Sequence, residues 1–399
     1  MRHVLALSTL YPNAARPGFG GFVARSLTAL GARGDWRVSV IAPIGMPPIA
    51  ARRYAELAKA ARASTRFGGL ENGVQVYRPR FTLIPKIGAR LNSSLIARAV
   101  LPLARRLHAA TPFHLIEAQF FFPDGPAAAR IASALGIPLS IKARGGDIHY
   151  WGTQAHALRR MREAAEHAAG MLAVSAALRR DMIALGLPGD KIAVHYTGLD
   201  RARFQPMAQD EARAKIAALG LPGAGPLLVS VGALTPGKGQ RLAVHALAEL
   251  PGVHLALVGA GPEEASLRKL VADTGLSERV HFLGQVAHDV LPTLLSAADA
   301  MVLPSASEGL ANAWIEALAC GTPLVISDVG GAREVVTGPD AGRLVARNSG
   351  AIAAAVRELL ADPPMPEAVA EHAARFSWDT HATALAGYYE GIVARSPGR

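Results

Sequence analysis

The feature that most constrains the fold is a rhythm of short apolar runs, each followed by a glycine-containing turn and a helical pattern. In the first half these runs include HVLALSTL, WRVSVIAP, HLIEAQ, PLSIKARG, GMLAVS and KIAVHYTG. The rhythm restarts after Ala224 with PLLVSVGAL, HLALVGAG, VHFLGQ, AMVLPS, PLVISD and GRLVA. Short β-rich runs that alternate with helices are typical of parallel sheets covered on both faces. The sequence therefore predicts an α/β fold with two doubly wound domains.

A polar, proline-containing stretch near residues 200–225 separates the two series. We predict an N-terminal domain over residues 1–199 and a C-terminal domain over residues 200–377. Ligands bind at the carboxyl ends of the strands in open α/β sheets, so the two domains are expected to face each other across a cleft. Many functions use this architecture, and the site residues must therefore decide between them.

Composition indicates a globular protein of two domains in a reducing compartment. The chain has 399 residues, and its single cysteine, Cys320, excludes an internal disulfide. The opening MRHVLALSTLYPN is interpreted as a buried first strand and not as a signal peptide. The most apolar long segment, Gly309–Ile326, contains Glu316 and a Gly/Pro break, which favours a core helix and strand over a membrane span. We expect a cytoplasmic protein.

The net charge of +11 is concentrated between residues 51 and 110, which hold twelve Lys or Arg against two Glu. Apolar residues such as Phe67, Phe81 and Leu91 are interleaved with these cations. This mixture indicates a peripheral surface for anionic lipid headgroups at the inner face of the cytoplasmic membrane. No nucleic-acid motif accompanies the patch, so nucleic acid is not expected as a partner. A solvated helical face is the alternative.

Two glutamates, Glu308 and Glu316, stand eight positions apart in the otherwise apolar run SEGLANAWIEALAC. Glu308 follows a strand in a loop that opens a helix, and Glu316 lies about one turn inside that helix. The loop residues Gly309, Leu310, Ala311 and Asn312 would present free N–H groups, which suits a phosphate. Carboxylates accept hydrogen bonds from sugar hydroxyls, so the pair predicts a phosphorylated sugar as ligand. An ordinary surface helix with two glutamates is the alternative.

Two further turns are candidate anion sites. VGALTPGKGQ ends a strand and places Lys238 just before a helix, where its charge suits a diphosphate, although an exposed lysine is an equal alternative. PGFGGFVARS places Gly20 and Gly21 at the start of another helix. Neither this turn nor VGAGPEE completes G-x-G-x-x-G, which disfavours a nicotinamide enzyme.

The segment IKARGGDIHYW ends another strand with Arg144, Asp147 and His149 close together in the chain. A structural salt bridge and a binding role are both open. The histidines show no H-x-x-x-H spacing, so no metal site is predicted.

The run PSASEGLANAWIEALACGTPLVISDVGGAREVV resembles the hallmark segment of the family 4 retaining glycosyltransferases, with its E-x7-E pattern intact. Other segments resemble the family in the same order, and they are GFGGFVARSLTALGARG, AVSAALRRDMIALGLPGDKIAVHYTGLDRARF, VGALTPGKGQ, ALVGAGPEEASLRKL, VHFLGQV and FSWDTHATALAGYYEGI. The resemblance implies the GT-B fold, with two Rossmann-like domains. It also implies that the helix at 378–396 packs back on the first domain, and that the second domain holds the nucleotide-sugar donor.

The resemblance implies roles for individual residues. Glu308 would lie against the donor sugar, Lys238 would neutralise the diphosphate, and Glu316 would take the ribose hydroxyls. The remaining donor-binding set is backbone around Gly20, Gly21, Gly232, Val286, Gly309, Leu310, Ala311 and Asn312.

Two positions depart from the family pattern. Ala233 stands where the family often has an arginine, which leaves Lys238 with the helix N-termini, or with help from Arg241. Arg144 stands where many members have a histidine. Together with Asp147 and His149 it is a candidate acceptor contact, and the R-G-x-D form resembles a branch that acts on cell-surface polysaccharides.

We therefore expect a metal-independent hexosyltransferase that needs no cofactor beyond its UDP- or GDP-sugar donor. It would transfer the sugar, with retention, to a hydroxyl of a lipid-linked or cell-surface glycan. The alternative from another class is a non-catalytic, two-domain protein that binds a sugar or nucleotide.

Overall fold

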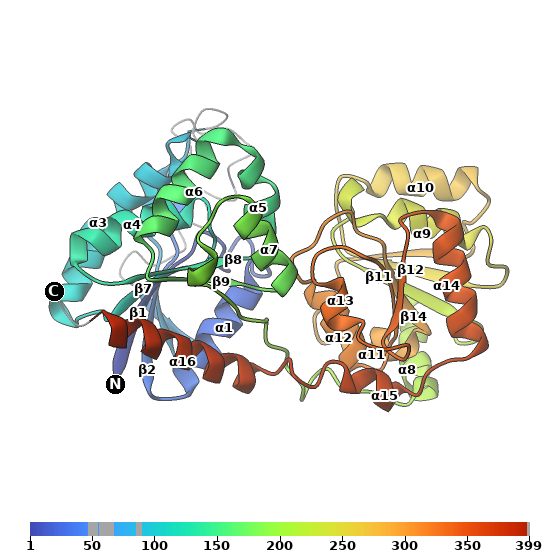
Figure 1. Ribbon diagram of the computed structural model, residues 1–399. Coiled ribbons are helices and arrows are strands. Elements are labelled where there is room, and N and C mark those ends of the chain that lie inside the picture. Colours follow the sequence, from blue (N-terminus) through green and yellow to red (C-terminus); the bar gives the residue numbers. More distant parts are fainter. Residues whose placement is uncertain (47–54, 56–67, 85–89, 397–399) are drawn as a thin grey trace. The chain divides into compact units, whose positions relative to one another are not determined.

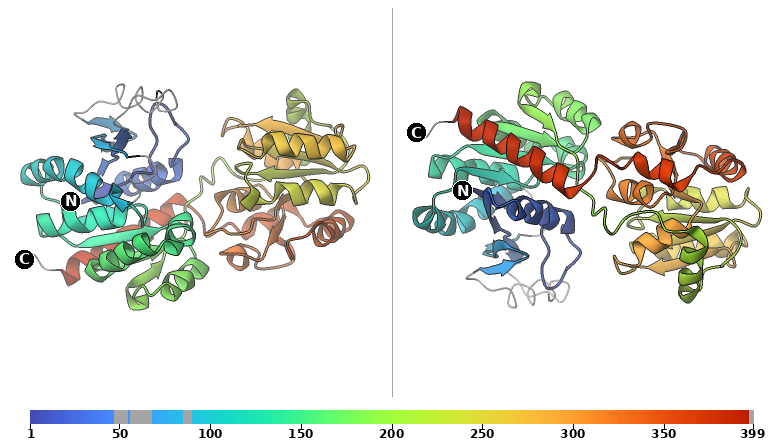
Figure 2. Two further views of the ribbon diagram at one scale, coloured as in Figure 1. Left: turned by 90° about the horizontal axis from the view of Figure 1, so that it is seen from above. Right: turned by 90° about the horizontal axis from the view of Figure 1, so that it is seen from below.

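The computed structural model describes residues 1–46, 55, 68–84 and 90–396, and the chain divides into two compact units (Figure 1). Residues 1–198 and 378–399 form the first unit, and residues 199–377 form the second. Each unit is built on a parallel or mainly parallel sheet with helices on both faces (Figure 2). This confirms the predicted α/β class.

The sheet of the first unit has the order β10-β9-β8-β7-β1-β2-β5-β4, and only β4 runs antiparallel to its neighbour. Its strands are β1 (Arg2–Leu7), β2 (Trp36–Ile41), β4 (Gly69–Glu71), β5 (Val74–Tyr77), β7 (Leu115–Ala118), β8 (Leu139–Ala143), β9 (Gly170–Ala173) and β10 (Ile192–Val194). A separate parallel pair joins β3 (Ile44–Met46) to β6 (Arg80–Thr82). Winding reverses between β1 and β7, so the loops after these two strands lie at the point where such sheets bind ligands.

The helices of the first unit follow the strands as the pattern predicts. They are α1 (Gly21–Ala32), α3 (Asn92–Ala110), α4 (Asp124–Leu135), α5 (Gly146–His149), α6 (Ala155–His167), α7 (Ala176–Ala184) and α16 (Trp378–Arg395). Helices α1 and α16 cover one face of the sheet, while α3, α4 and α6 cover the other (Figures 1 and 2). Ser175 caps the N-terminus of α7, because its side chain accepts a hydrogen bond from the Leu178 N–H at 3.0 Å.

Helix α16 belongs to the core of the first unit although it comes from the far end of the chain. The Tyr389 ring packs edge-on against Trp36, with ring centroids 5.3 Å apart, and both side chains are fully buried. The His381 Nδ1–H donates to the Tyr196 carbonyl oxygen at 2.7 Å, which leaves Nε2 to accept from the Ser26 hydroxyl at 2.6 Å. The helix therefore joins α1 to the sheet through both apolar and polar contacts.

The sheet of the second unit has the order β13-β12-β11-β14-β15-β16 and is parallel throughout. Its strands are β11 (Leu227–Val231), β12 (His254–Val258), β13 (Val280–Gly284), β14 (Ala300–Leu303), β15 (Leu324–Ser327) and β16 (Gly342–Val345). Its helices are α8 (Gln209–Ile216), α9 (Gln240–Leu247), α10 (Glu264–Asp273), α11 (Leu291–Ala297), α12 (Asn312–Ala319), α13 (Ala332–Val335), α14 (Ser349–Ala361) and α15 (Pro366–Glu371). The central strands are buried along their length except at Val231, the last residue of β11, as expected for strands covered on both faces.

The basic 51–110 region lies in part outside the described residues. Within its described part, Arg78 is almost fully buried and is paired with Glu71. Leu70 and Leu91 are exposed. In the residues that the structure describes, no helix is both long and apolar enough to cross a membrane.

Candidate active site

The topological switch point of the second unit lies between β11 and β14, where the winding of the sheet reverses. The loop after β11 ends in a 3-10 turn, Pro236–Lys238, and the loop after β14 carries Glu308. The two loops touch, because the Ala306 N–H donates to the Gly237 carbonyl oxygen at 2.7 Å. Gly239 has φ of +77°, and a Cβ there would lie 2.3 Å from the Pro304 carbonyl oxygen. Because β11 lies beside β14, the loops after these two strands are in contact although they are far apart in the sequence.

Lys238 and Glu308 form an ion pair at this switch point. The Lys238 Nζ donates to the Glu308 Oε1 at 2.5 Å, with the two side chains 28% and 10% exposed respectively. This pair explains how a carboxylate is tolerated in such an apolar segment, because a desolvated carboxylate needs a cationic or hydrogen-bonding partner. The alternative of an exposed lysine is wrong, because the Lys238 side chain is partly buried and paired. Arg241, the other cation considered, is exposed on α9.

Arg347, which the sequence did not single out, braces both loops. Its guanidinium donates from Nε to the Pro304 carbonyl oxygen at 3.0 Å and from Nη2 to the Pro236 carbonyl oxygen at 3.1 Å. One side chain after β16 thus holds the loop of Lys238 against the loop of Glu308. No local motif marks this role, since its partners are backbone carbonyls from distant strands.

The loop that carries Glu308 opens a helix, as predicted, and this helix, α12, begins at Asn312 with Ala311 in extended conformation before it. The loop before the helix rests on the turn after β15, where the Gly331 N–H donates to the Gly309 carbonyl oxygen at 3.0 Å. Leu310 is buried. Ala311 makes no side-chain cap at this helix N-terminus, so its partial positive charge is left uncapped four residues after Glu308.

Glu316 lies one turn inside α12, and its side chain is 12% exposed. Its carboxylate is 3.6 Å from the Nε2 atom of His288. His288 lies in the loop that follows β13, two residues after the half-buried Val286. Glu316 on α12 therefore lies close to the loop that contains Val286. Gly232 follows the last residue of β11, and a Cβ there would meet its nearest neighbour only at 3.8 Å.

In the first unit, Gly20 and Gly21 begin α1 as predicted. Gly20 has φ of +71°, and a Cβ there would lie 2.4 Å from the Leu10 carbonyl oxygen, so glycine is required. A Cβ at Gly21 would meet nothing within 4 Å. The start of α1 is therefore open to a ligand at Gly21.

Arg144, Asp147 and His149 do not form the simple salt bridge that their spacing allowed. The guanidinium of Arg144 donates to the Gln119 carbonyl oxygen at 3.0 Å and to its Oε1 at 2.6 Å. Asp147 is fully buried and accepts from three backbone N–H groups, at 2.7–2.9 Å, and burial raises its pKa. The His149 Nε2 lies 2.9 Å from Asp181. The three side chains thus serve separate contacts.

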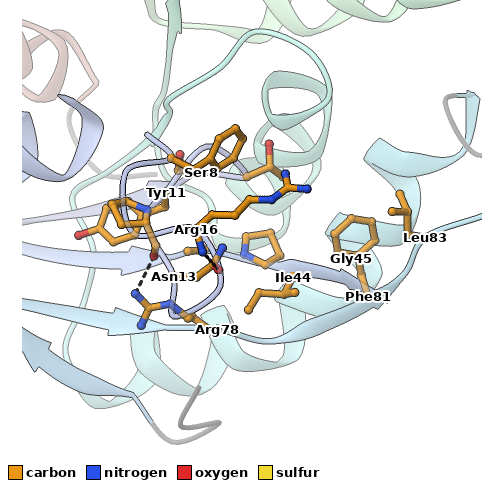
Figure 3. Close-up of a pocket in the computed structure, with 14 residues that line it drawn as sticks. Ser8, Tyr11, Asn13, Arg16, Ile44, Gly45, Arg78, Phe81 and Leu83 are labelled. Carbon is orange, nitrogen blue, oxygen red and sulfur yellow. Dashed lines mark hydrogen bonds between the residues drawn. The ribbon is translucent and has the colours of Figure 1, made fainter. Parts of the chain in front are cut away.

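A pocket of about 210 Å³ opens in the first unit at the carboxyl ends of β1 and β2 (Figure 3). Its lining includes the apolar side chains of Ile44, Phe81 and Leu83 and the polar side chains of Ser8 and Asn13. The Arg16 guanidinium lies 5.6 Å from the centroid of the Phe19 ring at the same pocket. No motif in the sequence marks this pocket. Within the described residues, no group of three or more His, Cys, Asp or Glu could hold a metal ion.

Comparison with known proteins identifies the class. The sucrose-phosphate synthase of Thermosynechococcus elongatus has a TM-score of 0.81 at 22% identity, over 99% of this chain and 100% of that one. HepE of Anabaena, in complex with UDP and glucose, has a TM-score of 0.73 at 22% identity, over 98% of this chain and 100% of that one. The fold is GT-B, as predicted.

Two family models match, described as "Glycosyl transferase 4-like domain" over residues 20–198 and "Glycosyl transferases group 1" over residues 211–376. The D-inositol 3-phosphate glycosyltransferase of Mycobacterium tuberculosis is 38% identical over 228 residues, which are 54% of this chain and 47% of that protein. The match thus spans about half the length of this curated relative. The chain belongs to the group 1, family 4-like glycosyltransferases.

Proposed function

We propose that the protein is a retaining glycosyltransferase that moves a sugar from a nucleoside-diphosphate sugar to an acceptor hydroxyl. The observation that carries this proposal is the pairing of Lys238 with Glu308 at the switch point of the second unit, beside the uncapped start of α12. A cation and a helix N-terminus together suit a diphosphate. A carboxylate beside them suits the hydroxyls of the attached sugar.

Each donor contact follows from the position of its residue. Lys238 binds the diphosphate, and the backbone N–H groups at the start of α12 add their partial positive charge. Glu308 orients the sugar, Glu316 accepts hydrogen bonds from the ribose hydroxyls, and backbone near Val286 meets the base. The Anabaena HepE structures with UDP and with UDP-glucose support a nucleoside-diphosphate sugar as donor.

In the reaction, the bond between the anomeric carbon and the diphosphate oxygen breaks while the acceptor oxygen attacks from the same face. The acceptor proton passes to the departing diphosphate. Lys238 stabilises the negative charge that develops on the leaving group, and Glu308 holds the sugar as its ring gains positive charge. Because these groups supply the stabilisation, we propose that transfer needs no metal.

The acceptor binds to the first unit, at the pocket between the loops after β1 and β2. One wall carries Phe81 and Leu83, while Ser8, Asn13 and Arg16 present polar groups. This combination suits a sugar that carries an anionic group and an apolar chain, which are the features of a lipid-linked glycan. The D-inositol 3-phosphate relatives support an anionic acceptor.

A peripheral membrane association follows from a lipid-linked acceptor and from the basic 51–110 region. Flotation with anionic liposomes at moderate salt tests it, with neutral liposomes as the control. Equal behaviour with both kinds of liposome would refute it.

The proposed donor site is tested by thermal shift with UDP, GDP and their sugar conjugates, each with Mg²⁺ and with EDTA. We expect one nucleoside diphosphate to raise Tm without metal in wild type and not in Glu316→Ala. Stabilisation by none of them would refute the donor site. Binding of a labelled nucleotide sugar without transfer to any acceptor would favour a binding protein instead.

A further inference from the structure

His288 lies between an arginine and the second glutamate of the site. Its Nδ1 is 3.1 Å from Nη1 of Arg203, and its Nε2 is 3.6 Å from Oε1 of Glu316. Its ring also meets the buried ring of Phe204 edge-on, with centroids 5.2 Å apart and planes at 81°. The imidazole is therefore held on three sides.

The contact with Arg203 determines which ring nitrogen carries the proton. A guanidinium has only donors, so the His288 Nδ1 must offer its lone pair to Arg203. In the neutral imidazole the single proton is then on Nε2, which is the nitrogen that faces Glu316. Arg203 thus directs an N–H group of His288 toward the carboxylate.

Arg203 has a second partner in Asp200. Its backbone N–H donates to the Asp200 side chain at 3.3 Å, and its Nε lies 3.9 Å from Oδ2 of the same residue. Arg203 and Phe204 belong to the segment through which the chain enters the second unit at Leu199. A short linker segment therefore supplies both groups that fix the His288 ring.

We infer that His288 is a positioning residue for Glu316, with its tautomer set by Arg203. This inference rests on the proposed function, in which Glu316 takes the ribose hydroxyls of the donor. At 3.6 Å, beyond hydrogen-bond distance, the Nε2–H group attracts Oε1 electrostatically, and this attraction favours one orientation of the Glu316 carboxylate. His288 acts through Glu316 and needs no contact with the nucleotide.

A purely structural role for His288 predicts a different result from a positioning role. If the ring only supports the fold, its loss should weaken every nucleotide to the same extent. If it acts through Glu316, its loss should weaken only nucleotides that have ribose hydroxyls. Glutamine is the conservative replacement, because its amide can both accept from Arg203 and donate to Glu316.

The test measures binding of UDP, GDP and ADP, each beside its 2′,3′-dideoxy form, by calorimetry at pH 8. We expect wild type to prefer the ribose form of its nucleotide by about tenfold or more. In His288→Ala this preference should fall to about twofold, while the affinity for the dideoxy form stays unchanged. His288→Gln should keep most of the preference, and His245→Ala, at an exposed site on α9, should keep all of it.

A double-mutant cycle completes the test, because His288→Ala should add nothing in a Glu316→Ala background. Equal weakening of both nucleotide forms, or a glutamine variant as poor as alanine, would overturn the positioning role alone. Wild type that binds none of the three diphosphates would overturn the proposed function and this role with it.

Discussion

The Lys238–Glu308 pair makes a prediction that can be measured without knowing the acceptor. In the absence of donor, Glu308 is paired with Lys238, the cation that the proposed mechanism assigns to the diphosphate. The two anions therefore compete for one lysine. Glu308→Gln removes the competing charge while keeping the size of the side chain, so it should bind a nucleoside diphosphate more tightly than wild type and turn over more slowly.

The size of the effect follows from the geometry. Opposite unit charges 2.5 Å apart attract by about 2 kcal/mol in bulk water and by more in a partly desolvated site. Most of this attraction is offset by desolvation, which leaves about 1 kcal/mol for a pair that is partly exposed. Release of that energy corresponds to about fivefold tighter binding. Turnover should fall by about 10²-fold or more, because the sugar loses its carboxylate.

Calorimetry with UDP and GDP at low salt measures the affinity, and initial transfer rates measure turnover. The control is Lys238→Met combined with Glu308→Gln, in which the gain in affinity should disappear. A Glu308→Gln variant with wild-type Tm that binds both diphosphates no more tightly than wild type would refute competition for Lys238.

Three further predictions concern other parts of the chain. Gly20→Ala should cost about 1–3 kcal/mol of stability, because its φ of +71° suits glycine and a Cβ would clash with the backbone. Gly21→Ala should leave Tm unchanged and lower turnover. Thermal unfolding and rate measurements on both variants separate the two effects. Burial raises the pKa of Asp124 from 3.8 to about 7, so its contribution to stability is full below about pH 4 and is lost as pH rises toward 7. The free energy of unfolding of Asp124→Asn should therefore rise by about 3 kcal/mol relative to that of wild type as the pH is raised from 5 to 8. A difference in urea unfolding that stays constant over this pH range would contradict this. Burial raises the pKa of the Cys320 thiol to about 12, so iodoacetamide at pH 8 should modify it only in unfolded protein, as mass spectrometry would show.

Elements whose signals are local were predicted correctly from the sequence. The loop at Glu308 and the start of α12 at Asn312 lie within a few residues of each other, and their order of strand, loop and helix is visible in the residue pattern. The opening strand β1 and the strand β15 after the glycine–proline break were found for the same reason.

Contacts that depend on strand order could not be predicted in this way. Lys238 and Glu308 are 70 positions apart, and their meeting requires β11 to lie beside β14. Arg347 bonds to backbone carbonyls, which carry no residue signature. The role inferred for His288 rests on its position between Arg203 and Glu316, neither of which is near it in the sequence.

Nearness in the sequence did not bring one group of side chains into a shared contact. Arg144, Asp147 and His149 span six positions, but Arg144 precedes α5, while Asp147 and His149 lie within it, where side chains point in different directions. Asp147 turns inward to backbone N–H groups, and His149 pairs with Asp181 on α7. Polar residues that are close together in the sequence after a strand are therefore weaker support for a shared site than two separate turns at one switch point.

The position of α16 has a consequence for biosynthesis. On the ribosome, β1 to β10 are complete long before this helix emerges, because residues 199–377 are translated in between. At typical translation rates the interval is roughly 10 to 40 s. During it, Trp36 and its apolar neighbours on the sheet lack the side chains of α16 that later bury them. The second unit is one continuous stretch of chain and can fold before α16 is made. Until then the nascent first unit exposes an apolar face of its sheet, which is the kind of surface that chaperones bind.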